Sequence, residues 1–141
     1  MNDPADRNEF PPDVSGGAAP ISLFVSDAVV TVPPTATLRE VAVTIVRETV
    51  GCAVVGTVDQ VDGIISERDV TQLVAQGEDL DDVTAASLTD RPLVWVDHAA
   101  SVEEVADEML QGYVRHVLVG EDGLLIGVVS MRDVIAAYAT A

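Results

Sequence analysis

The sequence lacks lysine, contains one cysteine and few aromatic residues, and carries very little positive charge. All seven of its basic residues are arginines, and they stand against 24 acidic residues, which gives a formal net charge of −17 over 141 residues. A nucleic-acid backbone or an anionic membrane requires a basic face on its partner, so we expect neither as a partner. A small anionic ligand is still compatible with this charge, because charges more than about 8–10 Å apart are largely screened at physiological salt.

Further absences concern location and catalysis. No apolar run approaches the roughly 18–20 residues of a membrane span, and the N-terminus lacks the basic-then-apolar order of a signal peptide, which predicts a cytoplasmic protein. The single cysteine, Cys52, cannot form an internal disulfide and lies in a predicted buried strand, as an inert thiol. His98 and His116 are not spaced as in a catalytic triad or a metal site. We therefore expect no catalytic residue, no metal ligand and no enzymatic activity.

What the sequence does contain is a long internal repeat. Residues 37–75 align without a gap on residues 101–139, and 12 of these 39 positions are identical. The clearest part is Gly63–Val70, which returns as Gly127–Val134: a glycine, two β-branched residues, serine, a spacer, arginine, aspartate and valine. Two copies of about 60 residues are too few for a solenoid. We therefore expect two repeats that pack face to face about a pseudo-twofold axis.

Hydrophobic periodicity and helix punctuation predict the same elements in both repeats. In the first repeat we expect a short strand at 30–32, a helix from Thr37 that Gly51 ends, strands at 53–56 and 61–66, and a helix at 67–75. In the second repeat we expect strands at 93–96, 117–120 and 124–130, a hairpin loop at 121–123, and helices that begin at Ser101 and at Met131. Met109 and Tyr113, on the apolar face of the helix from Ser101, are predicted core residues.

The order of these elements predicts an α/β (α+β) fold of two β-α-β-β-α repeats packed through their sheets. Residues 1–20 are rich in proline, glycine and charged residues and are predicted to be a disordered tail. Residues 21–76 are assigned to the first repeat and residues 83–141 to the second. The acidic stretch 77–82 between them lacks the alternating ligands of a calcium loop, so we interpret it as a solvated linker.

The repeated stretch places a serine and an aspartate where a strand ends and a helix begins: Ser66 and Asp69 in the first repeat, Ser130 and Asp133 in the second. One interpretation is a capping box at each helix start. The other is ligand binding. A capping box prefers the longer Glu, which both preceding helices have at this position, so these aspartates could instead accept hydrogen bonds from the hydroxyl groups of a ligand.

An arginine precedes each of these aspartates, Arg68 in the first repeat and Arg132 in the second. Both lie in the first turn of a helix, where the helix dipole and the unpaired amides attract anions. Capping and ligand binding are compatible, and both interpretations stay open on these residues alone.

The two halves resemble a tandem pair of CBS (cystathionine β-synthase) domains, the regulatory pair often called a Bateman module. The resemblance covers residues 21–141 and rests on Val30-Thr31-Val32-Pro33, the capped helix from Thr37, the strand at 53–56 and the two hydrophobic-hydrophobic-Ser-x-x-Asp motifs. It implies a non-catalytic regulatory module without a required cofactor, whose clefts bind AMP, ADP, ATP or S-adenosylmethionine. It also implies a homodimer that acts on a protein target. The alternative is a ligand-free structural or protein-interaction dimer.

In the family pattern the motif aspartate binds ribose hydroxyls, which suits Asp69 and Asp133, and residues beside it bind phosphate, which suits Ser66, Arg68, Ser130 and Arg132. The first strand of the opposite repeat and the residue that leads into the second strand complete each cleft. By this resemblance the Asp133 cleft has Thr31 and Arg115 at those positions, whereas the Asp69 cleft has Trp95 and Gly51. We therefore expect tighter nucleotide binding at Asp133.

Two residues bear further on the Asp69 cleft. Glu67 places an acid beside its phosphate position, which weakens phosphate binding there. Trp95 either stacks on a purine or fills the cleft as a core residue, and we favour the core residue.

Overall fold

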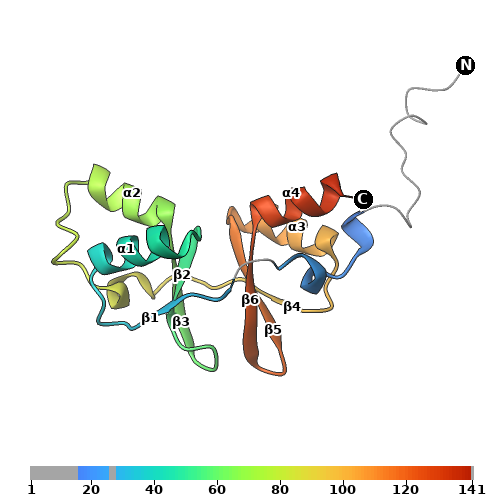
Figure 1. Ribbon diagram of the computed structural model, residues 1–141, viewed down its shortest axis with the longest axis horizontal. Coiled ribbons are helices and arrows are strands. Elements are labelled where there is room, and N and C mark those ends of the chain that lie inside the picture. Colours follow the sequence, from blue (N-terminus) through green and yellow to red (C-terminus); the bar gives the residue numbers. More distant parts are fainter. Residues whose placement is uncertain (1–15, 26–27, 141) are drawn as a thin grey trace, which may run out of the picture.

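Each half of the chain builds a three-stranded sheet with two helices, and the computed structural model, which describes residues 16–25 and 28–140, places the halves side by side (Figure 1). The first half contains β1 (Thr31–Val32), α1 (Leu38–Glu48), β2 (Cys52–Gly56), β3 (Val61–Ser66) and α2 (Glu67–Ala75). The second half contains β4 (Trp95–Asp97), α3 (Val102–Gly112), β5 (His116–Glu121), β6 (Leu124–Ser130) and α4 (Met131–Ala139). The described residues also include three short 3₁₀ helices, η2 (Gly16–Ala18), η3 (Ile21–Phe24) and η4 (Ala85–Leu88).

The two sheets have the same topology and pack against each other. Their strand orders are β1-β2-β3 and β4-β5-β6, each with a parallel outer pair and an antiparallel hairpin. Because side chains alternate along a strand, Ala53 and Val55 of β2 join the core beneath the helices of their own half, whereas Val54 packs with Leu118 and Leu125 of the other half. The predicted packing of the repeats through their sheets is confirmed.

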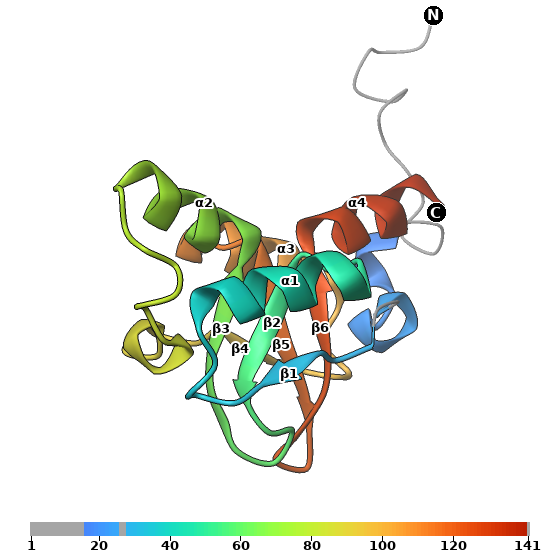
Figure 2. The same ribbon diagram turned by 60° about the vertical axis from the view of Figure 1, so that its left-hand side comes forward.

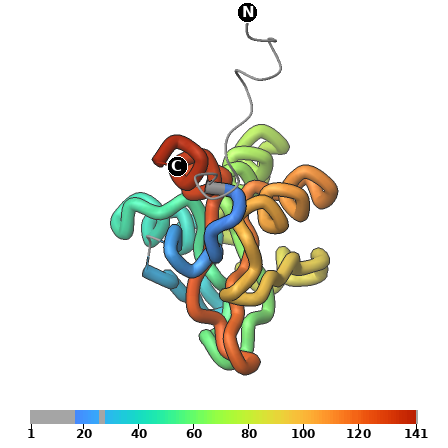
Figure 3. Tube along the Cα trace, turned by 90° about the vertical axis from the view of Figure 1, so that its right-hand side faces the viewer, coloured from blue at the N-terminus to red at the C-terminus, as the bar shows by residue number. Residues whose placement is uncertain are grey.

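Both hairpins extend to the same end of the molecule (Figure 3). There the amide of Leu125 donates a hydrogen bond of 2.9 Å to the carbonyl oxygen of Val58, which joins the two halves. The four helices lie at the opposite end, so that α2 and α4 begin far from the hairpin turns (Figure 2).

The segment before the first strand of each half packs on the other half. We call these the leading segments, residues 16–24 and 83–88. Ile21 is fully buried with Val102 and Met109 of the second half, whereas Ala85 is fully buried with Leu38 of the first. Figure 1 shows the first leading segment (blue) beside α3 and α4, and the second (yellow) beside α1.

Backbone hydrogen bonds hold each leading segment on the opposite half, an arrangement that we call the exchange of the leading segments. The amide of Ile21 donates to the carbonyl oxygen of Ala100 at 2.7 Å, and the amide of Ala85 donates to that of Ala36 at 2.8 Å. Each pair joins residues that are sixty-four positions from their counterparts in the other pair. The exchange therefore obeys the same pseudo-twofold relation as the sheets.

The ends of two helices differ from the prediction. Gly51 does not end α1; the helix ends at Glu48, and Thr49 takes the left-handed conformation with φ 57°. At the same place after α3, Tyr113 has φ 53° and is 95 % exposed, so its prediction as a core residue was wrong. Glycine is the usual residue at such a position, and a residue that turns out of the helix there no longer follows the helical face. Met109 is buried as predicted.

Smaller differences concern three connections. Strand β4 begins at Trp95, two residues later than predicted, and the hairpin loop shortens to Asp122-Gly123, both with positive φ, as in a type I′ turn. Residues 16–18, assigned to the tail, form η2 and pack on α3 and α4, whereas residues 1–15 lie outside the described residues. In the acidic linker, Asp81 pairs with Arg39 of α1 at 2.6 Å.

Among the described helices, none has the length and apolarity to cross a membrane.

Candidate functional site

The strand-to-helix turns at Ser66 and Ser130, which we call the first and second junctions (Ser66–Asp69 and Ser130–Asp133), are both complete capping boxes. The amide of each serine donates to Oδ2 of the aspartate at 2.8 Å. In return the aspartate amide donates to the serine Oγ, at 3.3 Å in the first junction and 3.1 Å in the second. These reciprocal bonds satisfy amides that the first helical turn leaves unpaired.

The capping-box interpretation is therefore confirmed at both junctions, and the preference of a capping box for Glu did not decide against it. At Thr37 and Ser101, only the cap oxygen is used: it accepts from the amides of Glu40 and Glu104 at 3.1 Å. Both glutamates are exposed, and neither returns a hydrogen bond to its cap. The shorter aspartate side chain therefore reaches the serine amide in both junctions.

Asp69 has a second partner that the sequence analysis missed. Nη1 of Arg91 donates to Oδ1 at 2.6 Å and Nη2 donates to Oδ2 at 3.1 Å, so the pair is bidentate. Burial raises the pKa of Asp69, but the hydrogen bonds from Arg91 and Ser66 outweigh this effect and hold the pKa below its ordinary value. Asp69 is thus a carboxylate whose charge is already compensated within the chain.

Asp133 lies deeper than its counterpart. It is 9 % exposed and is the one charged residue in the buried set of the described residues. The residue before β5, Arg115, reaches this junction through the backbone, since its carbonyl oxygen accepts from the amide of Met131 at 2.8 Å. The structure therefore places Arg115, Ser130, Arg132 and Asp133 in one neighbourhood.

Three of the predicted arginines present unpaired guanidinium groups. Arg68, Arg115 and Arg132 are all exposed, and none of them makes a side-chain hydrogen bond or ion pair in the part of the chain that the structure describes. Two of the three, Arg132 within the second junction and Arg115 beside it, lie at the second junction. Exposed guanidinium groups of this kind suit a phosphate, which they can contact in a bidentate manner.

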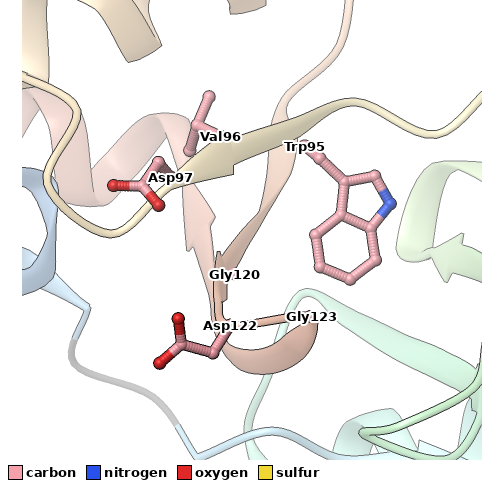
Figure 4. Close-up of a pocket in the computed structure, with 6 residues that line it drawn as sticks. All are labelled: Trp95, Val96, Asp97, Gly120, Asp122 and Gly123. Atoms are coloured by element: carbon pink, nitrogen blue, oxygen red, sulfur yellow. The ribbon is translucent and has the colours of Figure 1, made fainter.

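The first-strand residues Thr31 and Trp95 have different surroundings. Thr31 is exposed and pairs through its backbone with Val54 of β2. Within the described residues, no side-chain hydrogen bond joins it to the second junction. Trp95 is 43 % exposed, so its favoured interpretation as a core residue was wrong. Its indole packs against Gly120 and borders a shallow pocket of about 380 Å³ on the side of the first half (Figure 4).

This pocket is a poor site for a phosphate. Its lining includes Asp97 and Asp122 and no basic residue. Both carboxylates would repel a phosphate, and the hairpin turn that forms one wall belongs to the end of the molecule opposite the helices.

His116 lies between the two junctions and was also missed as a site residue. A side chain at Gly51 would meet its Nε2 at 2.9 Å, so the glycine leaves the room that the imidazole occupies. Burial lowers the pKa of His116; Asp133 and Glu67 oppose this effect, and Arg115 reinforces it. The imidazole therefore senses charges from both halves of the pair.

Among the described residues no cluster of three histidine, cysteine or acidic side chains could hold a metal ion.

The family model of the CBS domain matches residues 21–76 and again residues 85–140. The chain belongs to the CBS-domain family. It contains two CBS domains in tandem, and such pairs are regulatory modules, as the resemblance implied.

Known proteins similar to this CBS pair include one of unknown activity. An uncharacterized protein of Methanopyrus kandleri is 34 % identical over 110 residues, which cover 76 % of this chain and 56 % of that protein. The CBS pair thus spans little more than half the length of this relative.

Solved structures of CBS proteins have the same fold. A CBS-domain protein of Pyrobaculum aerophilum, solved in complex with AMP, is 34 % identical with a TM-score of 0.71, over 86 % of this chain and 99 % of that one. A CBS-domain protein of Agrobacterium tumefaciens is 30 % identical with a TM-score of 0.76, over 86 % and 95 %.

Proposed function

We propose that this CBS pair is a regulatory module that binds an adenosine-containing metabolite, AMP, ADP, ATP or S-adenosylmethionine, at the second junction. The observation that carries the proposal is the pair of exposed, unpaired guanidinium groups of Arg115 and Arg132 beside Ser130 and Asp133. The AMP complex of the Pyrobaculum aerophilum protein supports the ligand class. Bound ligand would contact both halves and change the surface that they offer to a target protein.

The residues at the second junction would contact different parts of the ligand. Arg115 and Arg132 would hold phosphate oxygens, each by charge-assisted hydrogen bonds. The hydroxyl of Ser130 accepts from the Asp133 amide, and its own proton can be donated to a phosphate. Asp133, fixed by the Ser130 amide, would accept from the ribose. Thr31 of the opposite half is proposed as a further polar contact.

The first junction suits a nucleotide less well. Its motif arginine, Arg68, has the acidic Glu67 as neighbour, and the position of Arg115 is taken by Gly51. Asp69 already accepts a bidentate pair from Arg91. We therefore propose Ser66, Arg68 and Asp69 as a weaker site that does not fill at ordinary nucleotide concentrations.

A second candidate function, a ligand-free dimeric interaction module, is favoured by the exposed apolar helix faces. The exposed side chains are Val43 and Val46 on α1, Val74 on α2, Leu110 on α3, and Ile135 and Tyr138 on α4. Monomeric proteins rarely leave large apolar surfaces uncovered. We propose that a second copy of the chain covers part of them, which is compatible with nucleotide binding.

The test is a thermal-shift and calorimetric panel of AMP, ADP, ATP and S-adenosylmethionine. A ligand that binds only the folded pair must stabilise it, by about 2.7 kcal/mol at one hundred times its dissociation constant. We expect one ligand to raise Tm, and Arg115→Ala and Asp133→Asn to abolish the shift while Asp69→Asn retains it. No shift with any of the four ligands would overturn the binding proposal in favour of the second candidate, whose own test is the molar mass in sedimentation equilibrium.

A further inference from the structure

We propose that Arg91 is a specificity-determining residue that occupies the first junction from within the chain, so that each copy takes up at most one nucleotide. This inference rests on the proposed function, because it concerns the second of its two clefts. The guanidinium of Arg91 lies against the carboxylate that a ligand's ribose would need. The effect is to convert a pair of repeated motifs into a single working site.

The contacts at Asp69 leave little capacity for a ligand. Its Oδ2 accepts from the amide of Ser66, from the hydroxyl of Ser66 and from Nη2 of Arg91, at 2.8, 3.1 and 3.1 Å. Its Oδ1 accepts from Nη1 of Arg91 at 2.6 Å. A carboxylate offers about four lone-pair sites, and here four donors point at it.

Arg91 is itself held in place on both sides. Its Nη2 also donates to the carbonyl oxygen of Ile64 at 2.8 Å, and its Nε donates to that of Leu88 at 3.2 Å. The side chain therefore bridges β3 of the first half and the leading segment of the second. The side chain of Arg91 is 43 % exposed and that of Asp69 is 15 % exposed.

Displacement of this group by a nucleotide is unfavourable. Both an arginine and a ribose hydroxyl form charge-assisted bonds to a carboxylate, but the arginine pair is charged on both sides and bidentate, so its displacement would also leave a guanidinium without its counter-ion. A ligand would also have to compete with a group that is tethered to the site by the chain. We therefore infer that the occupant stays in place at ordinary nucleotide concentrations.

The repeat does not place the same occupant at the second junction. The sixty-four-residue relation continues just past the leading segments. Thr89 lies against Gly63, and its counterpart Val25 lies against Gly127. Sixty-four positions before Arg91 the sequence has Asp27, whose side chain is a carboxylate without an N–H group. The arginine is thus a feature of one half only.

The experiment counts AMP molecules per chain by isothermal titration calorimetry. We compare the wild type with Arg91→Met, which keeps the aliphatic stem without the charge, and with Arg91→Met/Asp69→Asn. We expect one AMP for the wild type, two for Arg91→Met and one for the double variant. Urea denaturation checks that each variant is folded, and Arg39→Met, which removes the exposed pair with Asp81 on α1, is the matched control and should stay at one.

Arg91→Met in an Asp133→Asn background provides a second measurement. The background variant should bind no AMP, and the added change should restore one site. Two AMP molecules in the wild type, or no gain in either Arg91→Met variant, would overturn the role of Arg91. If the wild type binds one AMP and Arg91→Met also binds one, the proposed function stands and this inference fails. If the wild type binds none and Arg91→Met binds one, the inference stands and the second junction is wrong as the site.

Discussion

The two junctions have the same local structure and different partners. Each serine caps its helix, and each aspartate returns the bond at 2.8 Å. Beyond this shared box, Asp69 is covered by Arg91 from the other half, whereas Asp133 is buried beside the backbone of Arg115 and the exposed Arg132. The comparison teaches that a repeated motif fixes a turn, and that residues outside the motif decide which partners its aspartate has.

The largest effect that we expect concerns the leading segments. Ile21 is fully buried in the core of the second half, whereas its counterpart Ala85 is a small residue in the core of the first. Ile21→Ala should lower the free energy of unfolding by about 2–5 kcal/mol, because it removes buried methyl groups and leaves a cavity. Urea denaturation measures the loss. The exposed neighbour Leu23 is the control, and a loss for Leu23→Ala equal to that for Ile21→Ala would contradict the exchange.

The next effect separates the two kinds of helix start. Asp133 and Glu104 stand at the same position of their helices, but only Asp133 returns a hydrogen bond to its cap. Asp133→Ala should cost about 1.5–3 kcal/mol, the range for a hydrogen bond to a charged group, whereas Glu104→Ala should change stability by less than about 0.5 kcal/mol. Equal costs in chemical denaturation would show that the reciprocal bond contributes nothing.

A smaller effect follows from the lowered pKa of Asp69. The unfolded state takes up a proton near the ordinary pKa of 3.8, whereas the folded state does so at a lower pH. The stabilisation is therefore complete above the unfolded value and is lost as pH falls through the folded pKa. Asp69→Asn should flatten the decline of stability between pH 5 and pH 2 that the wild type shows. If stability of the variant falls with pH as steeply as that of the wild type, Asp69 does not contribute to acid destabilisation.

The smallest expected effect concerns His116, whose counterpart Cys52 is buried. Burial lowers the pKa of His116 from its ordinary 6.5, against the influence of Asp133 and Glu67. The unfolded state therefore binds a proton first as pH falls, and stability is lost below about pH 6.5. His116→Gln should remove this part of the pH dependence, as denaturation midpoints at pH 7.5 and 5.5 would show. An unchanged difference between the two midpoints would contradict the assignment.

Much of the fold could be predicted from the sequence, because the repeat and the local signals agree. The bounds predicted for β3, α2 and β6 are those of the structure, since serine caps and glycine turns mark them in the chain. The ends of α1 and α3 could not be placed in this way, because Thr49 and Tyr113 adopt the conformation that glycine usually supplies. The spacing of apolar residues continues past such a residue in the sequence, so it predicts a longer helix than the structure has.

The site was only partly predictable for a different reason. Ser130, Arg132 and Asp133 lie close together in the motif, and the family resemblance predicted Arg115 beside them. The pair of Arg91 and Asp69 joins residues 22 positions apart across the acidic linker, and no local pattern encodes such a contact. The same holds for the leading segments, whose apolar residues indicate burial without indicating in which half.

The exchange of the leading segments makes the pair, and not the repeat, the unit that folds. The leading segment of each half completes the core of the other half. A cut in the acidic linker would therefore leave two fragments, each with the leading segment that belongs in the other fragment's core. In effect the chain is a segment-swapped dimer whose two members have been joined into one polypeptide. Such a molecule has no independent lobes for a ligand to draw together, and any signal must pass through small shifts within a shared core.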